Sequence, residues 1–214
     1  MTPGFHWTLR PSVKEDDPVL KAFPAELPLL VKQLLLQRGF TGGMETELFL
    51  DPRLSHLSDP FLMGEMRAAV DRIFRAVDEG ETVCIYGDYD VDGVTSVALL
   101  RAILMAYDLD PQYFIPVRSR EGYGLSEAGI KRCLCECADP PSLLITVDCG
   151  TSSVKEVDML NSLGIDVIIL DHHEAGPLGR PDAAAVVNAK IEENSPYTYC
   201  LLYTSPSPRD MRRS

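Results

Sequence analysis

The chain has 214 residues, of which 45% are hydrophobic and 24% charged, which suits a globular protein with a hydrophobic core. A formal net charge of −12 argues against a generally basic nucleic-acid-binding surface, although not against a local one. No apolar run is long enough to span a membrane, and the first 17 residues lack a signal-peptide core, so we expect a cytoplasmic protein.

The first 80 residues predict an arm followed by short helices. Residues 1–24 are polar and proline-punctuated, as in an N-terminal arm, and residues 25–80 form a helical lead-in. Apolar residues at helical spacing predict its helices. These cover residues 26–39, 44–50 and 61–77. Two Asp-Pro turn signals predict a loop over residues 51–60.

After residue 80 the pattern changes to alternating strands and helices. Predicted strands cover residues 82–86, 112–117, 143–147, 166–170 and 184–187. Predicted helices cover residues 95–107, 125–137 and 152–163. This alternation predicts an α/β fold, a parallel sheet with helices on both faces. Functional sites in such sheets lie outside the carboxyl ends of the strands.

An acidic run, Asp88, Asp90 and Asp92, directly follows the first predicted strand. Its D-x-D-x-D-G pattern matches the start of an EF-hand loop, but Leu99 stands where that loop needs a glutamate. A strand also precedes it instead of a helix. Three crowded carboxylates repel one another, and a divalent cation such as Mn²⁺ or Mg²⁺ would relieve this repulsion.

A helix is predicted just after the acidic run. Its first amides, near Gly93 and Thr95, are candidate contacts for a substrate phosphate.

Two further strand ends carry candidate ligands. Asp148 follows the strand over residues 143–147, and we expect a serine at 152 or 153 to cap the next helix and leave Asp148 available for a metal. Asp171, His172 and His173 follow the strand over residues 166–170. Because neighbouring residues at a strand end point in different directions, one histidine is expected to ligate a metal while the other faces substrate.

Basic residues that follow the predicted strand over residues 112–117 are candidate phosphate contacts. They are Arg118, Arg120 and Lys131. For any one of them, a solvated loop is an equally good interpretation.

The six cysteines are expected to be free thiols. Cys133, Cys135 and Cys137 form a C-x-C-x-C pattern that lacks the spacing of a zinc knuckle. On a helix, Cys133 and Cys137 share a face while Cys135 points away. The spacing therefore disfavours a metal site made from these three residues.

Three of these segments together resemble the motifs of the DHH phosphoesterase superfamily. Residues 86–93 resemble its first motif, residues 147–150 its second and residues 171–173 its third. Within it, the chain is similar to the RecJ family of bacterial single-stranded-DNA-specific exonucleases. Segments that carry this narrower likeness are residues 35–40, 48–54, 59–63 and 121–125. The likeness runs from about residue 25 to residue 200 and implies a Rossmann-like DHH domain over residues 81–200.

The resemblance also implies an activity: metal-dependent 5′-to-3′ hydrolysis of single-stranded DNA in recombination and repair. It implies a two-metal site with Mn²⁺ or Mg²⁺, whose ligands match four residues. These are Asp88, Asp90, Asp148 and His172. His173 matches the histidine near the scissile phosphate, and Asp92 and Asp171 match residues that orient the catalytic groups. Tyr86 stands where some relatives carry a ligating histidine, which implies that one metal is held differently here.

The same likeness implies a monomer that acts on single-stranded DNA with a single-stranded-DNA-binding protein and a helicase as partners. The family's fourth motif, which supplies a further ligating aspartate, is missing, since Asp210 lies in a tail (201–214) that does not continue the fold's pattern. We therefore expect a truncated catalytic portion, with an incomplete domain and a non-native tail, that is inactive if isolated.

Two alternatives stay open. One is a DHH phosphodiesterase that acts on short oligonucleotides or cyclic dinucleotides. The other is a non-catalytic DHH-fold replication protein that has lost its metals.

Overall fold

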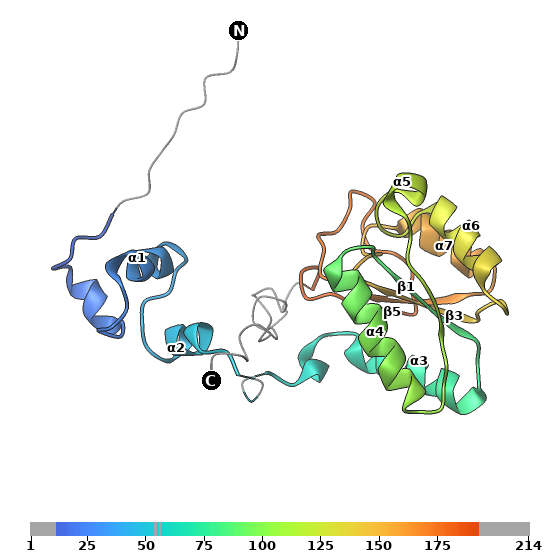
Figure 1. The fold of residues 1–214 in the computed structure, drawn as a ribbon, viewed down its shortest axis with the longest axis horizontal. Coiled ribbons are helices and arrows are strands. Elements are labelled where there is room, and N and C mark those ends of the chain that lie inside the picture. The colour runs from blue at the N-terminus through green and yellow to red at the C-terminus, as the bar shows by residue number, and fades with distance from the viewer. Residues whose placement is uncertain (1–11, 54, 56, 193–214) are drawn as a thin grey trace, which may run out of the picture. The chain divides into compact units, whose positions relative to one another are not determined.

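The computed structural model describes residues 12–53, 55 and 57–192 (Figure 1). The chain divides into two compact units between Leu57 and Ser58. Helix α3 (Met66–Glu79) belongs to the same unit as the sheet and packs on strand β5 (Ala185–Val187). The domain boundaries expected from the sequence stay predictions, and the tail at residues 201–214 lies outside the described residues.

The N-terminal unit contains short helices around a small apolar cluster. Its elements are the 3₁₀ helix η1 (Pro18–Ala22), α1 (Leu29–Gln37) and α2 (Met44–Leu50). The last part of the predicted arm is thus helical, because the Asp17 side chain accepts a hydrogen bond from the Val19 amide and caps η1. Phe23, Leu35 and Phe40 form the cluster. The two predicted helices of this unit are confirmed.

A five-stranded parallel sheet forms the centre of the second unit. Its strands are β1 (Val83–Gly87), β2 (Gln112–Phe114), β3 (Leu143–Val147), β4 (Asp166–Leu170) and β5 (Ala185–Val187). Their order across the sheet is β2-β1-β3-β4-β5, and every pair is parallel. The predicted α/β fold is confirmed.

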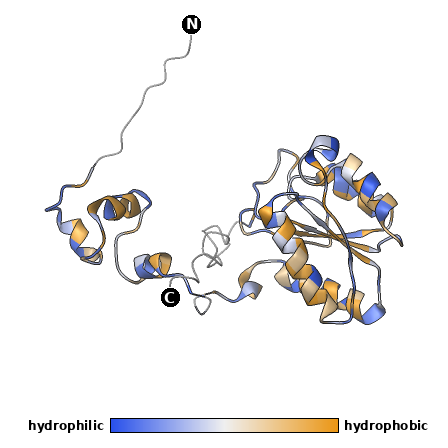
Figure 2. Cartoon of the chain, in the orientation of Figure 1, coloured by the Kyte–Doolittle hydropathy of each residue, from blue (hydrophilic) through white to orange (hydrophobic). Residues whose placement is uncertain are grey.

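Helices cover both faces of this sheet (Figure 1). They are α3 and α4 (Val91–Met105) on one face, and α6 (Glu127–Glu136) and α7 (Val154–Ser162) on the other. A short helix, α5 (Arg118–Glu121), precedes α6. The covering helices carry hydrophobic and hydrophilic residues on the same helix, as expected for elements between a core and solvent (Figure 2).

The pleat of the strands divides their side chains between the two faces. Tyr86 of β1 and Ile169 of β4 lie in one core cluster with Ile130 of α6 and Val157 of α7, and all four are nearly or fully buried. Central strands buried on both faces explain why the sequence shows continuous apolar runs there instead of alternation.

Three element boundaries differ from the predictions. Helix α4 begins at Val91, because Asp90 caps it by accepting hydrogen bonds from the amides of Asp92 and Gly93. Helix α3 begins at Met66, because Asp59 caps a separate 3₁₀ turn, η3 (Pro60–Leu62). The third prediction, a strand to residue 117 and then a loop, is wrong because β2 ends at Phe114 and α5 follows.

Among the described residues, every helix is too short or too polar to span a lipid bilayer.

Candidate metal centre

The three candidate segments meet at one edge of the sheet. Asp88 follows β1, Asp148 follows β3 and the Asp171–His173 segment follows β4, and these three strands are neighbours in the order β1-β3-β4. Ligand atoms of Asp88, Asp90 and Asp148 lie within 4.8 Å of one another. Those of Asp148, His172 and His173 do so too. The convergence expected from parallel strand ends is thus observed, with Asp148 common to both groups.

Asp88 is buried without hydrogen-bond donors. Its side chain is 1% exposed, and neither carboxylate oxygen has a hydrogen-bond partner among the described residues. Oδ2 of Asp148 is in the same situation. A buried polar atom without a partner destabilises a fold by about 1–3 kcal/mol, and more when it is charged. A divalent cation between these oxygens would remove that penalty, so the donor set fits Mn²⁺ or Mg²⁺.

Asp148 is unusual in its backbone and its ionisation. Its φ of 61° lies in the left-handed region that few non-glycine residues adopt. Burial and the neighbouring Asp90 carboxylate raise the pKa of Asp148 to about 7. Such conformations persist where the surroundings enforce them, often at functional sites.

Asp90 serves both the helix and the cluster. Its Oδ1 accepts hydrogen bonds from the amides of Asp92 and Gly93, each at 3.0 Å. The Gly93 amide is the main cause that lowers the pKa of Asp90. The capping interaction therefore holds a negative charge at the mouth of the cluster. Asp92 lies in the first turn of α4, where its amide links it to Asp90.

Asp171 organises the two histidines. Its Oδ1 accepts hydrogen bonds from the amides of His172 (2.7 Å) and His173 (3.1 Å), and Nδ1 of His173 lies 2.7 Å from the same oxygen. Its Oδ2 accepts from the Thr151 amide at 3.0 Å. Burial acts to raise the pKa of Asp171, but these hydrogen bonds outweigh it and the pKa is lowered. Asp171 is thus held as an anion that orients both rings.

The two imidazoles point to different neighbours. Nε2 of His172 lies 3.0 Å from Oδ1 of Asp148, whereas Nε2 of His173 lies 3.0 Å from the hydroxyl of Tyr123. Burial raises the pKa of Tyr123 to about 12, so its hydroxyl keeps its proton at neutral pH. The His173 side chain is 41% exposed and accessible to a ligand. The ligand role expected for one histidine and the substrate role expected for the other stay predictions.

A row of rings extends from His173 toward α5. Ring centroids of Tyr123 and His173 lie 6.1 Å apart, and those of Tyr89 and Tyr123 lie 6.4 Å apart. The guanidinium of Arg118 lies 5.5 Å from the centroid of the Tyr89 ring. Arg118 is therefore near the cluster, and Arg120 is exposed on the same helix. Lys131 forms an ion pair with Glu127 instead.

Gly93 and Thr95 support the first turn of helix α4 and its packing against the chain after β1. A Cβ at Gly93 would lie 2.3 Å from the Asp88 carbonyl oxygen, so only glycine lets the chain after β1 pack this closely on α4. The Thr95 hydroxyl donates to the Val91 carbonyl at 2.6 Å. Contact of either residue with a substrate stays a prediction.

One expectation about a neighbouring residue needs correction. No serine side chain caps α7, because the Ser153 hydroxyl donates to the Leu125 carbonyl at 3.2 Å. Tyr86 points into the core, where its hydroxyl donates to the Gly124 carbonyl at 3.1 Å. Its position at the first motif therefore does not bring it among the candidate ligands.

Sequence reasoning missed a supporting residue, Asn188. It is fully buried, and its Nδ2 donates to the Thr151 hydroxyl and to the His173 carbonyl, both at 2.8 Å. It thereby joins the segments after β3, β4 and β5. The available signal was its place directly after the predicted strand 184–187, at the same edge of the sheet as the acids.

A family model described as "DHH family, N-terminal domain" matches residues 82–206. This chain belongs to the DHH family. Single-stranded-DNA-specific exonuclease RecJ of Bacillus subtilis is 40% identical to it over 179 residues, which are 83% of this chain and 22% of that protein. RecJ of Escherichia coli is 34% identical over 173 residues, 79% of this chain and 28% of that protein. The chain thus spans about a quarter of the length of these relatives.

Solved structures agree with this assignment of fold. A manganese-bound RecJ exonuclease aligns with 64% of this chain and 34% of its own, at a TM-score of 0.57 and 31% identity. RecJ of Thermus thermophilus in complex with Mn²⁺ aligns with 83% of this chain and 24% of its own, at a TM-score of 0.57 and 28% identity.

Proposed function

We propose that this chain is part of the catalytic core of a metal-dependent exonuclease that hydrolyses single-stranded DNA from 5′ to 3′ in recombination and repair. The names of the relatives support the substrate. The observation that carries the proposal is the pair of candidate ligand groups that share Asp148, because together they supply the carboxylates and imidazole that suit Mn²⁺ or Mg²⁺.

Asp88, Asp90, Asp148 and His172 would hold Mn²⁺ or Mg²⁺. When bound, such ions supply an activated water and stabilise negative charge on the oxygens around phosphorus. The buried, unpartnered oxygens of Asp88 and Asp148 support the assignment, and manganese in the similar RecJ structures supports the choice of metal.

The chain's own groups suit a phosphodiester substrate. Oδ1 of Asp171, whose pKa is lowered, lies 2.7 Å from Nδ1 of His173 and holds the ring in place. The His173 side chain is 41% exposed beside Tyr123, and it is proposed to contact a scissile phosphate. Arg118 and Arg120 on α5 are proposed to bind other phosphates of the strand, and Gly93 and Thr95 to line its path.

Two other functions fit the same fold less well. A phosphodiesterase for short oligonucleotides or cyclic dinucleotides would use the same centre, but the relatives in which the likeness extends over 179 residues are exonucleases. A non-catalytic DHH protein would not need to keep the Asp88 carboxyl group buried without a hydrogen-bond donor among the described residues.

A chimera tests the proposal in the context of a complete enzyme. The aligned segment of Bacillus subtilis RecJ is replaced by that of this chain, and the product is incubated with 5′-labelled single-stranded DNA, duplex DNA and a cyclic dinucleotide, with Mn²⁺ or with chelator. We expect Mn²⁺-dependent degradation of single-stranded DNA alone. Asp88→Asn should abolish it and Asp158→Asn, an exposed change on α7, should not. Preference for the cyclic dinucleotide would refute the substrate assignment.

The remaining expectations are proposals of the same kind. Five described cysteines are free thiols, which supports a reducing, cytoplasmic location. A monomeric state and association with a single-stranded-DNA-binding protein and a helicase rest on the RecJ likeness alone.

A further inference from the structure

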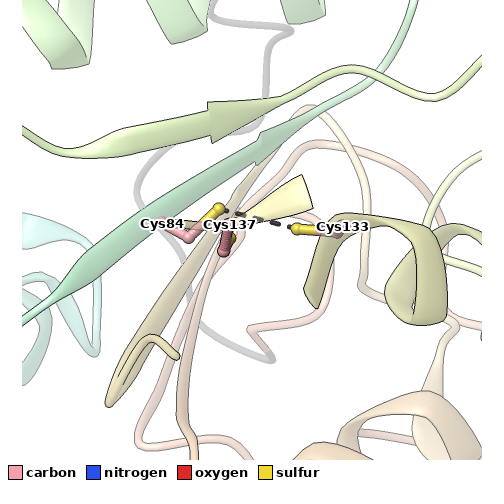
Figure 3. Close-up of side chains that lie close together, drawn as sticks. All are labelled: Cys84, Cys133 and Cys137. Carbon is pink, nitrogen blue, oxygen red and sulfur yellow. Dashed lines mark hydrogen bonds between the residues drawn. The ribbon is translucent and has the colours of Figure 1, made fainter. Parts of the chain in front are cut away.

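Three cysteines lie close together although one of them is 49 residues earlier in the chain than the nearest of the others. They are Cys84 on β1, Cys133 on α6 and Cys137 at the end of α6 (Figure 3). Sγ of Cys84 lies 3.6 Å from Sγ of Cys133, and all three sulfur atoms lie within 4.8 Å of one another. Cys135 is exposed on the same helix and takes no part.

The separation of the Cys84 and Cys133 sulfur atoms is close to that in a thiolate metal site. Zn–S bonds of about 2.3 Å in a tetrahedral site place neighbouring sulfur atoms about 3.8 Å apart. A disulfide would instead need the sulfur atoms about 2 Å apart. The three sulfur atoms are therefore close enough to share one ion with small adjustments.

The protein holds Cys137 in this position through its neighbours. The Gln112 side chain accepts a hydrogen bond from the Ala138 amide at 2.5 Å and donates to the Asp139 carbonyl at 2.8 Å. Gln112 on β2 is the register partner of Cys84 on β1. The chain after α6 is thus tied to the sheet next to Cys84, and the ψ of 133° at Cys137 ends the helix there.

The residues around the three sulfur atoms suit a thiophilic cation with three thiolate ligands and one further coordination position. Cys84 and Cys133 are 0% and 1% exposed and lie in the apolar core cluster, whereas Cys137 is half-buried. Thiolates select thiophilic ions such as Zn²⁺ over the Mn²⁺ and Mg²⁺ that suit carboxylates. The partial exposure of Cys137 gives an ion an entry path and a water as fourth ligand.

We propose that Cys84, Cys133 and Cys137 form a second metal site, separate from the DHH centre, that binds one thiophilic divalent cation of the Zn²⁺ type. The three thiols lose their protons to solvent when the ion binds, and no electrons are transferred. The bound ion would fasten the C-terminal end of α6 to β1, the strand that leads into Asp88.

Cadmium is the probe, because thiolate-to-cadmium charge transfer gives a near-ultraviolet absorption that carboxylates and imidazoles do not produce. Reduced, metal-free protein is titrated with Cd²⁺, and we expect the band to saturate at one ion per chain. Cys137→Ala should weaken this binding at least ~10-fold, since even the loss of groups that only support ligands costs about 10- to 100-fold. Cys135→Ser is the matched control and should bind like the unchanged protein.

Several outcomes would overturn the proposal. They are the absence of a charge-transfer band in the folded, reduced protein, equal weakening by Cys135→Ser, or loss of two thiols as a disulfide without metal uptake. Circular dichroism checks that Cys137→Ala is folded; if it is not, the titration of the unchanged protein still decides. Asp88→Asn should keep the band, so failure of this site and failure of the proposed nuclease centre are distinguishable.

Discussion

Asp148 combines a left-handed backbone with a carboxyl group that is buried beside another acid. In the unfolded chain its pKa is near the usual 3.8, and in the fold it is raised to about 7. Between these values the folded state holds a proton that the unfolded state has released. The contribution of Asp148 to the stability of the metal-free protein therefore falls as pH rises from about 4 to about 7 and stays low above that range.

Replacing Asp148 by asparagine should separate stability from metal binding. Asparagine tolerates the left-handed conformation and carries no charge, so metal-free Asp148→Asn should be more stable at pH 8 by roughly 1–3 kcal/mol, the range for a buried polar group without partners. Mn²⁺ binding should be lost. Urea unfolding at pH 5 and pH 8 measures the first effect, with Asp158→Asn as the control. Equal destabilisation at both pH values would contradict the assigned pKa.

Single residues also mark what sequence alone could predict. Asp88, Asp148 and the two histidines were identifiable because they lie immediately after apolar strands. The roles of Asn188 and Tyr123 were not predictable, because they come from contacts with segments 15 to 50 residues away, and the place of Asn188 after a strand indicates only its edge of the sheet. The place of Cys84 beside two other thiols was not predictable for the same reason, since it lies 49 residues before Cys133. The spacing of Cys133, Cys135 and Cys137 alone disfavoured a metal site.

At the scale of elements, Asp90 has two roles: it caps helix α4, and it belongs to the candidate metal centre. The strands were predictable to within a few residues from their apolar runs. The first residue of α4 was not predictable, because the capping residue Asp90 belongs to an acidic run whose pattern also indicates a metal-binding loop. The cap draws the acidic run into the first turn of the helix.

Two substitutions at Asp90 should separate these roles. Asparagine keeps the capping oxygen but removes the charge, so Asp90→Asn should change stability by less than about 0.5 kcal/mol while weakening Mn²⁺ binding. Asp90→Ala removes both and should destabilise the protein by about 1 kcal/mol as well. Thermal unfolding and calorimetric titration of both variants measure this. If alanine and asparagine were equally stable, the cap would not contribute.

The junction of β1 and α4 depends on the missing side chain at Gly93. Gly93→Ala places a Cβ against the backbone of Asp88 and should displace that residue, with loss of Mn²⁺ affinity and a destabilisation of about 1–3 kcal/mol, as for other overpacked sites. Gly64→Ala is a suitable control, because its Cβ would meet only the flexible Glu192 side chain at 3.3 Å. Similar losses in both variants would contradict the close-packing argument.

At the scale of the whole molecule, the order of the strands brings candidate ligands from distant segments of the sequence to one site. Parallel strands β1, β3 and β4 lie side by side, so segments up to 85 positions apart in the chain deliver their acids and histidines to one edge. Alternation of strands and helices predicted this fold and its site-bearing edge. The order of strands and the contacts that orient each ligand are tertiary features, which local patterns do not specify.

The most direct test of the central claim is calorimetric titration of the metal-free chain with Mn²⁺, compared with Asp88→Asn and with the exposed control Asp158→Asn. Asp88 is buried, and neither of its carboxylate oxygens has a hydrogen-bond partner in the described part of the chain, so an ion there should depend on it. We expect Asp88→Asn to weaken Mn²⁺ binding at least ~10-fold, and Asp158→Asn to leave it unchanged. Unaltered Mn²⁺ binding in folded Asp88→Asn would contradict a metal centre at this edge of the sheet.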